Sequence, residues 1–347
     1  MDYRSSGVDI NLGNELVQRV KQLAQRTFTT GVLSDIGSFG GLFQINPEAF
    51  REPVLVASAD GVGTKLKVAF LADRHDTVGI DLVNHCVNDI LVQGARPLFF
   101  LDYLSMGRLS PDISTAVIEG VANGCCLNGC ALLGGETAEM PGFYSDNEYD
   151  LAGFIVGIVS RERLIDGREI HPGDLIVGLP SSGLHTNGYS LARQIVFDTL
   201  NLNVNSEINE LGTTIGEELL RSHRSYVSTV SPLLDAGLVK GLAHITGGGL
   251  TENVPRALPV GTAARLVRQT WTVPSVFHFL QDAGQVPEED MYRTFNMGIG
   301  LIIVVDRKSL DSVWSVLATT EEKNAVLVGE VIEGDQKVVY EENGAIS

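Results

Sequence analysis

The sequence has few basic residues and no long apolar run. Its 347 residues include 25 Lys and Arg against 43 Asp and Glu, a formal net charge of −18. A field of this sign repels nucleic acid backbones and anionic membrane surfaces, so we expect neither as a partner. No apolar stretch approaches the ~20 residues of a membrane helix, and the opening residues MDYRSSGVDI lack the apolar core of a signal peptide. We therefore expect a cytoplasmic protein.

Cysteine is also scarce, and its four positions do not have the spacing of a zinc ribbon. They are Cys86, Cys125, Cys126 and Cys130. We interpret all four as reduced, buried small hydrophobic residues. The alternative is a redox or metal role for the cluster at 125–130, which loss of activity on alkylation would support.

Both common nucleotide-binding motifs are missing from the sequence. There is no G-x-x-x-x-G-K-[ST] stretch and no G-x-G-x-x-G opening a helix. An ATP site in this chain would therefore be of another type. In so acidic a protein, a polyanionic ligand also requires a divalent cation, and carboxylates that bind metal become the residues of interest.

The composition that remains is that of an ordinary globular protein, with 44% hydrophobic and 20% charged residues. The length fits two domains, and a connector-like mixture of charges, glycine and proline at 161–172 marks the boundary. We assign domains to residues 1–162 and 163–347. Apolar patterns predict an α/β or α+β architecture, with strands at 54–58, 98–104, 131–133, 149–160, 174–179, 243–245 and 297–305, and helices at 81–93, 110–128, 188–200, 226–236 and 273–283.

Two of the predicted helices carry further signals. The helix at 81–93 leaves Asp81, His85 and Asn88 on its polar face, which can look into a site. The helix at 110–128 begins at Ser110-Pro111-Asp112, with a side-chain cap, a proline in the first turn and an acid favoured by the dipole.

Two glycine-rich stretches with acidic residues follow predicted strands. The first is residues 59–66, where Asp60 precedes Gly61 and Gly63, and the second is residues 134–142, which contain Glu136. Together with Asp81, these acids can supply the oxygen ligands that magnesium prefers. Each acid alone is more often a turn former or a helix cap, but three such positions favour a metal site.

Two further glycine-rich stretches, residues 181–190 and 246–253, carry no acid next to the glycines. In the first, small residues let backbone N–H groups approach an anion ahead of a helix, and His185 can serve as a general acid or base. A lone loop histidine is more often a polar turn residue. The triplet Gly247 to Gly249 suggests close approach of the backbone to a ligand or strand, or a flexible turn. For residues 293–298, packing is the default interpretation.

Read together, these stretches resemble the phosphoribosylformylglycinamidine cyclo-ligase family, also called aminoimidazole ribonucleotide synthetases, of purine biosynthesis. The likeness covers nearly the whole chain, and the order and spacing of the motifs make it specific. The matching stretches are residues 2–3 (DY), 6–9 (SGVD), 60–66 (DGVGTKL), 79–81 (GID), 134–142 (GGETAEMPG), 181–190 (SSGLHTNGYS), 246–249 (TGGG) and 295–298 (FNMG). Ala59 departs from the threonine often found before the Asp-Gly pair.

The resemblance implies a two-domain α+β subunit. An amino-terminal α/β domain would pair through its sheet into a homodimer, a carboxy-terminal α/β domain would follow, and ATP would occupy a cleft that is not a P-loop. It also implies ATP and Mg²⁺ as cofactors and a small ribonucleotide, formylglycinamidine ribonucleotide, as substrate.

The resemblance also implies roles for individual residues. Lys21 matches a lysine of the ATP site, Asp60 and Asp81 match acids near magnesium, and His185 matches an active-site histidine. We expect His185, Lys21 and Asp60 to be catalytic and Asp60, Asp81 and Glu136 to bind metal. The expected ATP-binding residues are Lys21, Asp60, Gly61, Gly63, Thr64, Lys65, Gly134, Gly135 and Glu136. The expected substrate-binding residues are Ser181, Ser182, Gly183, His185, Asn187, Thr246, Gly247 and Gly248; which glycine-rich loop binds the 5-phosphate is open.

Two alternatives remain open. One is a different enzyme of the same superfamily, resembling selenophosphate synthetase, thiamine-monophosphate kinase or the larger formylglycinamidine ribonucleotide synthetase. The absence of a glutaminase portion and of an amino-terminal catalytic Cys or Sec argues against it. The other is a non-catalytic nucleotide-binding scaffold, against which His185, Asp60 and Lys21 argue.

Overall fold

The computed structural model describes residues 10–346, which fold into two compact units. The first unit comprises the chain up to Ile90 together with Ala95–Arg163, and the second comprises Leu91–Gly94 and the chain from Leu164 onward. The chain passes from the first unit to the second after Arg163, one residue beyond the domain boundary expected from the sequence. The matching stretches at 2–3 and 6–9 lie outside the described residues.

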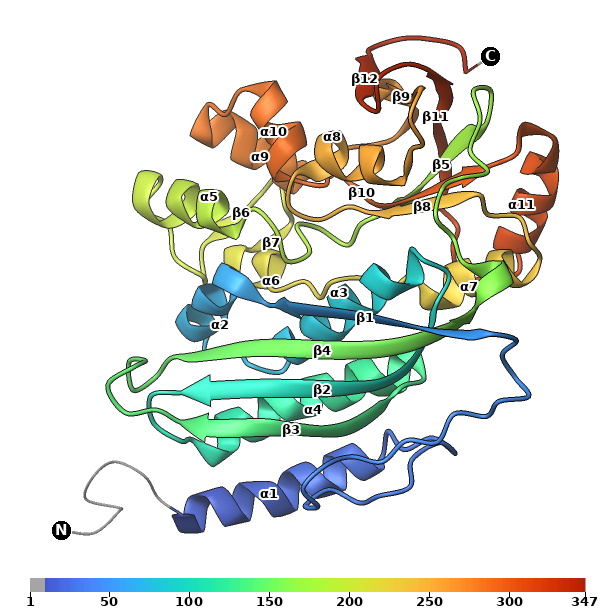
Figure 1. The fold of residues 1–347 in the computed structure, drawn as a ribbon. Coiled ribbons are helices and arrows are strands. Elements are labelled where there is room, and N and C mark those ends of the chain that lie inside the picture. Colours follow the sequence, from blue (N-terminus) through green and yellow to red (C-terminus); the bar gives the residue numbers. More distant parts are fainter. Residues whose placement is uncertain (1–9, 347) are drawn as a thin grey trace. The chain divides into compact units, whose positions relative to one another are not determined.

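A four-stranded sheet forms the centre of the first unit (Figure 1). Its order is β1 (Pro53–Gly61), β4 (Tyr149–Ser160), β2 (Arg96–Met106) and β3 (Ala131–Glu139). β4 is antiparallel to both neighbours, whereas β2 and β3 are parallel. The parallel pair requires a crossover, and α4 (Pro111–Asn128) supplies it. The other helices of this unit are α1 (Ile10–Gln25), α2 (Leu66–Ala72) after the short 3₁₀ turn η2 (Gly63–Lys65), and α3 (Val78–Leu91).

The two faces of this sheet differ. On one face α3 packs so closely that a Cβ at Gly157 would lie 2.5 Å from Cδ1 of Ile90. On the other face Leu55 and Phe154 keep 58% and 46% of their surface exposed. The register pairs Phe154 with Ala59 and with Leu101, so this second face is apolar across three strands.

A six-stranded sheet forms the centre of the second unit. Only β12 and β9 are parallel among its pairs. Its order is β12 (Val338–Glu341), β9 (Thr262–Val267), β11 (Val326–Glu333), β5 (Leu175–Pro180), β10 (Ile299–Val305) and β8 (Gly241–His244). β10 is apolar apart from one glycine and buried throughout, as expected of a strand hydrogen-bonded on both sides.

Helices and a hairpin complete the second unit. α7 (Val227–Asp235) and α11 (Leu310–Leu317) contribute Val230, Leu233, Val313 and Leu317 to the core beneath β5 and β10. The remaining α-helices and strands, with one π-helix, are α5 (Tyr189–Arg193), the π-helical η4 (Gln194–Thr199), β6 (Glu207–Ile208), β7 (Thr213–Thr214), α6 (Ile215–Leu219), α8 (Gly249–Asn253), α9 (Ser275–Gly284) and α10 (Glu288–Thr294).

Most predicted elements are confirmed, and the errors are informative. The strand at 149–160 and the helix ending at Asn128 have the predicted bounds. β3 is longer than predicted, because β2 pairs with it through Gly134 and Gly135 as far as Glu139. The helix predicted at 188–200 changes to π-helix after Arg193. Ser110 precedes α4 without a side-chain cap bond, so that detail was wrong.

The cysteines are all free thiols, and three of the four are buried as predicted. Cys126 is exposed on α4, and its Sγ lies 3.6 Å from the backbone oxygen of Arg26. Among residues 10–346, no helix has the length and apolarity needed to cross a bilayer.

Candidate functional site

In the first unit, the carboxyl end of β1 and the side of α3 bring two acids to one histidine. Asp60 is the penultimate residue of β1, and its Oδ2 lies 2.7 Å from Nε2 of His85. Asp89 lies one helical turn beyond His85, with its Oδ2 3.8 Å from the same nitrogen. Ser58 Oγ donates to Asp89 Oδ2 at 3.1 Å, and the Gly61 N–H donates to Asp60 Oδ1 at 2.7 Å. Both carboxylates are therefore held in place.

The charges of this group are coupled. Burial acts to raise the pKa of Asp60, but the hydrogen bond and charge of His85 outweigh it, so the pKa lies below its usual value. Burial acts to lower the pKa of His85, but the hydrogen bond that its ring donates to Asp60, together with the charge of Asp89, raises the pKa above its usual value. Both acids keep part of their surface exposed. Partly open carboxylates of this kind suit Mg²⁺, which binds through one or two of them.

Lys65 and Asp81 form a second charged group that has no exposed surface. Lys65 Nζ lies 2.8 Å from one Asp81 oxygen and 2.9 Å from the other, and both side chains are 0% exposed. Burial lowers the pKa of Lys65, and the charge of Asp81 offsets part of that effect. The pair ties the turn after Gly63 to the first turn of α3. Metal binding by Asp81 and nucleotide binding by Lys65 stay predictions.

The other predicted residues of the first unit lie elsewhere on it. Lys21, on α1, forms an ion pair with Asp35 at 2.6 Å. Glu136 is exposed on β3. Gly134 and Gly135 lie within β3 itself, and a Cβ at Gly135 would overlap Oδ1 of Asp102.

A cavity of about 270 Å³ lies between α1 and this part of β3. Its walls include Leu16, Val17 and Val20 of α1, and Asp102 lines it from β2. Burial, followed by the charge of Glu136, raises the pKa of Asp102 to about 7. An acid thus faces a mostly apolar cavity beside the glycine-rich stretch of β3.

In the second unit, the Ser181–Gly183 loop after β5 is braced by Asn296. The Asn296 Nδ2 donates to the Gly183 oxygen at 2.8 Å, and its Oδ1 accepts from Ser181 Oγ and from the Gly298 N–H, both at 2.9 Å. Sequence reasoning missed this role and assigned the segment to packing. The available signal was the glycine two residues after the asparagine, whose φ is +95°.

The glycine triplet lies next to this loop. A Cβ at Gly247 would lie 3.4 Å from Oδ1 of Asn187, so the two loops are neighbours. Gly249 has φ +58°, and a Cβ there would overlap the carbonyl oxygen of Tyr292. Asn253 Nδ2 donates to the carbonyl of Gly249 at 2.9 Å. The triplet is therefore a site of close backbone approach, which only glycine allows.

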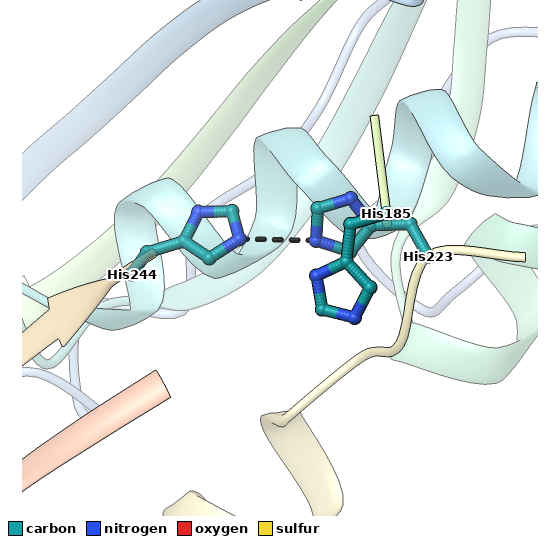
Figure 2. A group of neighbouring side chains, drawn as sticks. All are labelled: His185, His223 and His244. Atoms are coloured by element: carbon teal, nitrogen blue, oxygen red, sulfur yellow. Dashed lines mark hydrogen bonds between the residues drawn. The ribbon is translucent and has the colours of Figure 1, made fainter. Parts of the chain in front are cut away.

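His185 is buried within a group of three histidines, where sequence reasoning considered it alone (Figure 2). It has φ +62°, and its Nε2 accepts from the Ser182 N–H at 3.2 Å. Its ring stacks on His223 with centroids 4.0 Å apart, and His223 Nε2 lies 3.0 Å from His244 Nε2. No spacing in the sequence links the three, because they come from a loop, the segment before α7 and the end of β8.

The comparisons with known proteins cover both units. The AIR synthase related protein N-terminal domain matches residues 48–159, and the corresponding C-terminal domain matches residues 171–341. A phosphoribosylformylglycinamidine cyclo-ligase from Trichlorobacter lovleyi is 55% identical over 329 residues, which are 95% of this chain and 94% of that protein. The enzyme of the same name from Thermoanaerobacter pseudethanolicus is 50% identical over 339 residues, 98% of this chain and 100% of that protein.

Solved structures show the same fold at low identity. The hydrogenase maturation protein HypE in complex with ATP aligns with TM-score 0.67 and 17% identity, covering 95% of this chain and 91% of that one. Thiamine-monophosphate kinase from Stenotrophomonas maltophilia aligns with TM-score 0.66 and 17% identity, covering 95% and 96%. These likenesses establish the fold alone. Because the identity to the named relatives extends over nearly the full length of both proteins, the chain belongs to the phosphoribosylformylglycinamidine cyclo-ligase family.

Proposed function

We propose that this protein closes the imidazole ring of 5-aminoimidazole ribonucleotide from formylglycinamidine ribonucleotide, with ATP converted to ADP and phosphate, in purine biosynthesis. The observation that carries the proposal is the 50–55% identity to cyclo-ligases over the full length of the chain. The geometry supports it, because the acids, glycine turns and histidine named by the resemblance are built into hydrogen-bonded positions in both units.

The chemistry explains the need for ATP. An amide oxygen is a poor leaving group, so ring closure by the amidine nitrogen would have to expel hydroxide. Phosphorylation of that oxygen lets it depart as phosphate instead. The protein's work is then positioning and charge stabilisation.

In the first unit, we assign the binding of Mg²⁺ to Asp60 and Asp89. Oxygen ligands of this type fit the ion. His85 fixes the position of the Asp60 carboxylate through a 2.7 Å contact. An ion held by these residues would neutralise negative charge on the triphosphate. Asp81 has Lys65 as its partner and would bind metal only by leaving it. We also assign Glu136 to the metal ion and Lys21 to ATP. Lys21 would leave its ion pair with Asp35 to contact a phosphate group of the nucleotide.

In the second unit, we assign the ribose 5-phosphate to the backbone N–H groups of the Ser181–Gly183 loop and the Thr246–Gly248 turn. His185 stabilises or protonates the oxygen that becomes phosphorylated, a role usually worth about 10²- to 10⁴-fold in rate. Its position in the first turn after the Ser181–Gly183 loop supports this assignment.

The proposed assembly is a homodimer formed through the first unit's sheet. Its support is the apolar face on which Leu55 and Phe154 are exposed while α3 covers the opposite face. A second copy offers a matching apolar face, as symmetric dimers require. A cytoplasmic location is part of the same proposal.

The test is a coupled assay with purified protein, ATP, Mg²⁺ and formylglycinamidine ribonucleotide, following ADP and the aminoimidazole product separately. We expect both products in equal amounts. Thiamine monophosphate in place of the ribonucleotide is the control, and it should release no ADP. Nucleotide binding without ADP release in the presence of the ribonucleotide would overturn the proposal in favour of a non-catalytic scaffold.

A further inference from the structure

The three buried histidines of the second unit lie close enough together to be ligands of one metal ion. His185, His223 and His244 each offer one ring nitrogen, and these atoms all lie within 4.8 Å of one another. In tetrahedral zinc sites the metal–nitrogen bonds are about 2.0–2.1 Å, which puts ligand nitrogens ~3.3 Å apart. The 3.0 Å separation of His223 and His244 needs a change of only a few tenths of an ångström. The rings of His185 and His223 are stacked with an interplanar angle of 21°, so one of them has to rotate for both to direct a nitrogen at the same ion.

The hydrogen bonds around the rings show that at least two of the ring nitrogens are unprotonated, and a metal ion would replace those hydrogen bonds. In the 3.0 Å contact between Nε2 of His223 and Nε2 of His244, one of the two nitrogens must be unprotonated, because two N–H groups would repel. The Ser182 N–H donates to Nε2 of His185, so that nitrogen also carries a lone pair. Imidazoles in this state are the form that binds metal ions.

A second polar contact orients His223. Its Nδ1 lies 3.2 Å from Thr186 Oγ1. When Nδ1–H donates to that hydroxyl, Nε2 is the nitrogen with the lone pair, and it is the one that faces His244. Outer contacts of this kind usually fix the tautomer of a metal-binding histidine.

The surroundings hold the rings close together. A Cβ at Gly300, on β10, would lie 2.6 Å from Cε1 of His185, so the glycine makes room for that imidazole. His244 lies on β8, which is hydrogen-bonded to β10. The side chains are 1%, 1% and 6% exposed for His185, His223 and His244. His244 is therefore carried by the sheet, whereas His185 and His223 come from a loop and from the segment before α7.

We propose that His185, His223 and His244 form a binding site for a divalent transition-metal cation of the zinc class. Three imidazoles favour such ions, whereas Mg²⁺ prefers oxygen ligands. Three protein ligands leave a fourth position on a tetrahedral ion for water or another small ligand. This site consists of imidazoles rather than of carboxylates such as those of Asp60 and Asp89. It shares His185 with the proposed function, but metal binding can be measured without ATP or the ribonucleotide, so the two proposals can fail separately.

The experiment is a Zn²⁺ titration of the chelator-treated full-length protein by calorimetry, in a large excess of Mg²⁺ that occupies oxygen sites. Co²⁺ replaces Zn²⁺ in a parallel titration, because its visible spectrum reports tetrahedral nitrogen coordination. We expect one ion per chain and intense visible cobalt bands.

The variants decide whether the histidines are the ligands. His223→Ala and His244→Gln should each weaken binding by at least ~10-fold and abolish the cobalt bands. His278→Ala, which removes an exposed histidine of α9, should leave the affinity and the cobalt bands unchanged. Circular dichroism checks that each variant is folded, and His223→Gln serves if His223→Ala is not. No binding by the wild-type protein, or binding that survives both cluster substitutions, would overturn the proposal.

Discussion

Three aspartates of the first unit differ in burial and in the charged groups beside them. Asp60 keeps part of its surface open beside His85, whereas Asp81 is wholly buried against Lys65. Asp102 is also buried, but it faces a cavity and a second acid rather than a cation. The sequence singles out Asp60 and Asp81 as similar candidate metal ligands and does not single out Asp102, and only the neighbours of the three residues separate them.

The assignment of Asp89 to magnesium predicts a kinetic effect. Asp89→Asn removes one negative charge beside Asp60 and should raise the Mg²⁺ concentration needed for half-maximal ADP release by ~10-fold or more, with the fold unchanged. Initial rates against free Mg²⁺ are the measurement. Asp335→Asn, at an exposed position of the second unit, is the control and should match the wild type. An unchanged Mg²⁺ dependence in Asp89→Asn would remove this residue from the metal site.

For the buried ion pair of Lys65 and Asp81, we predict that a substitution lowers the stability of the fold rather than the affinity for metal. Asp81→Asn leaves the Lys65 ammonium buried without its counter-charge, which typically costs about 3–5 kcal/mol. Urea unfolding followed by circular dichroism should show the loss. The double variant Lys65→Met with Asp81→Leu removes both charges and should recover most of it. If Asp81→Asn were as stable as the wild type, the pair would not be structural.

Asp102 predicts a pH dependence of stability. Its pKa is about 7 in the folded protein and ~3.9 in an unfolded chain, so between these values the folded state binds one more proton. Stability should therefore fall by up to ~1.4 kcal/mol per pH unit as pH rises from about 4 to 7, and level off above. Asp102→Asn should remove this slope and raise the unfolding free energy at pH 8. Parallel stability profiles for the two proteins would contradict the prediction.

At the scale of elements, glycine turns and strand ends position the side chains of both sites. β1 carries Asp60 to its end, and β5 leads into the Ser181–Gly183 loop. Asn296 and the triplet at 247–249 then fix that loop from the side. The backbone of the glycine triplet lies close to other backbone atoms. A side chain added to one of these glycines should therefore destabilise the fold.

Gly249 offers the test of this rigidity. Gly249→Ala meets both a positive φ of +58° and overlap with the Tyr292 carbonyl, so we expect a loss above the ~1–2 kcal/mol of a left-handed alanine alone. Gly237→Ala is the matched control, with φ +67° and nothing within 4 Å of its Cβ. Urea unfolding of the two variants measures the difference. Equal losses would show that the backbone contact is not tight.

At the scale of the whole molecule, the exposed apolar face of the first unit's sheet predicts self-association. Phe154→Glu places a charge in the middle of that face and should shift the protein from dimer to monomer in light scattering coupled to gel filtration. Val260→Glu, at an exposed apolar residue of the second unit, should leave the mass unchanged. A wild-type monomer at micromolar concentration would exclude this interface.

Much of the fold and part of the candidate site could be predicted from the sequence. Local patterns located β4 and the end of α4, because periodicity and capping act over a few residues. They missed the extension of β3 through Gly134 and Gly135, because that depends on pairing with a distant strand. The motifs named Asp60 and His185 but not Asp89, and they included Asn296 without giving it a role.

The sequence by itself determined the family, the predominantly acidic composition and the residue types available for binding phosphate and metal. Only the tertiary structure decided which acid meets His85, which lysine is buried with Asp81, and that His185 has two histidine neighbours. The physical reason is that hydrogen bonds, ion pairs and desolvation act over a few ångströms between residues far apart in the chain. Those distances come into being only when strands and helices pack.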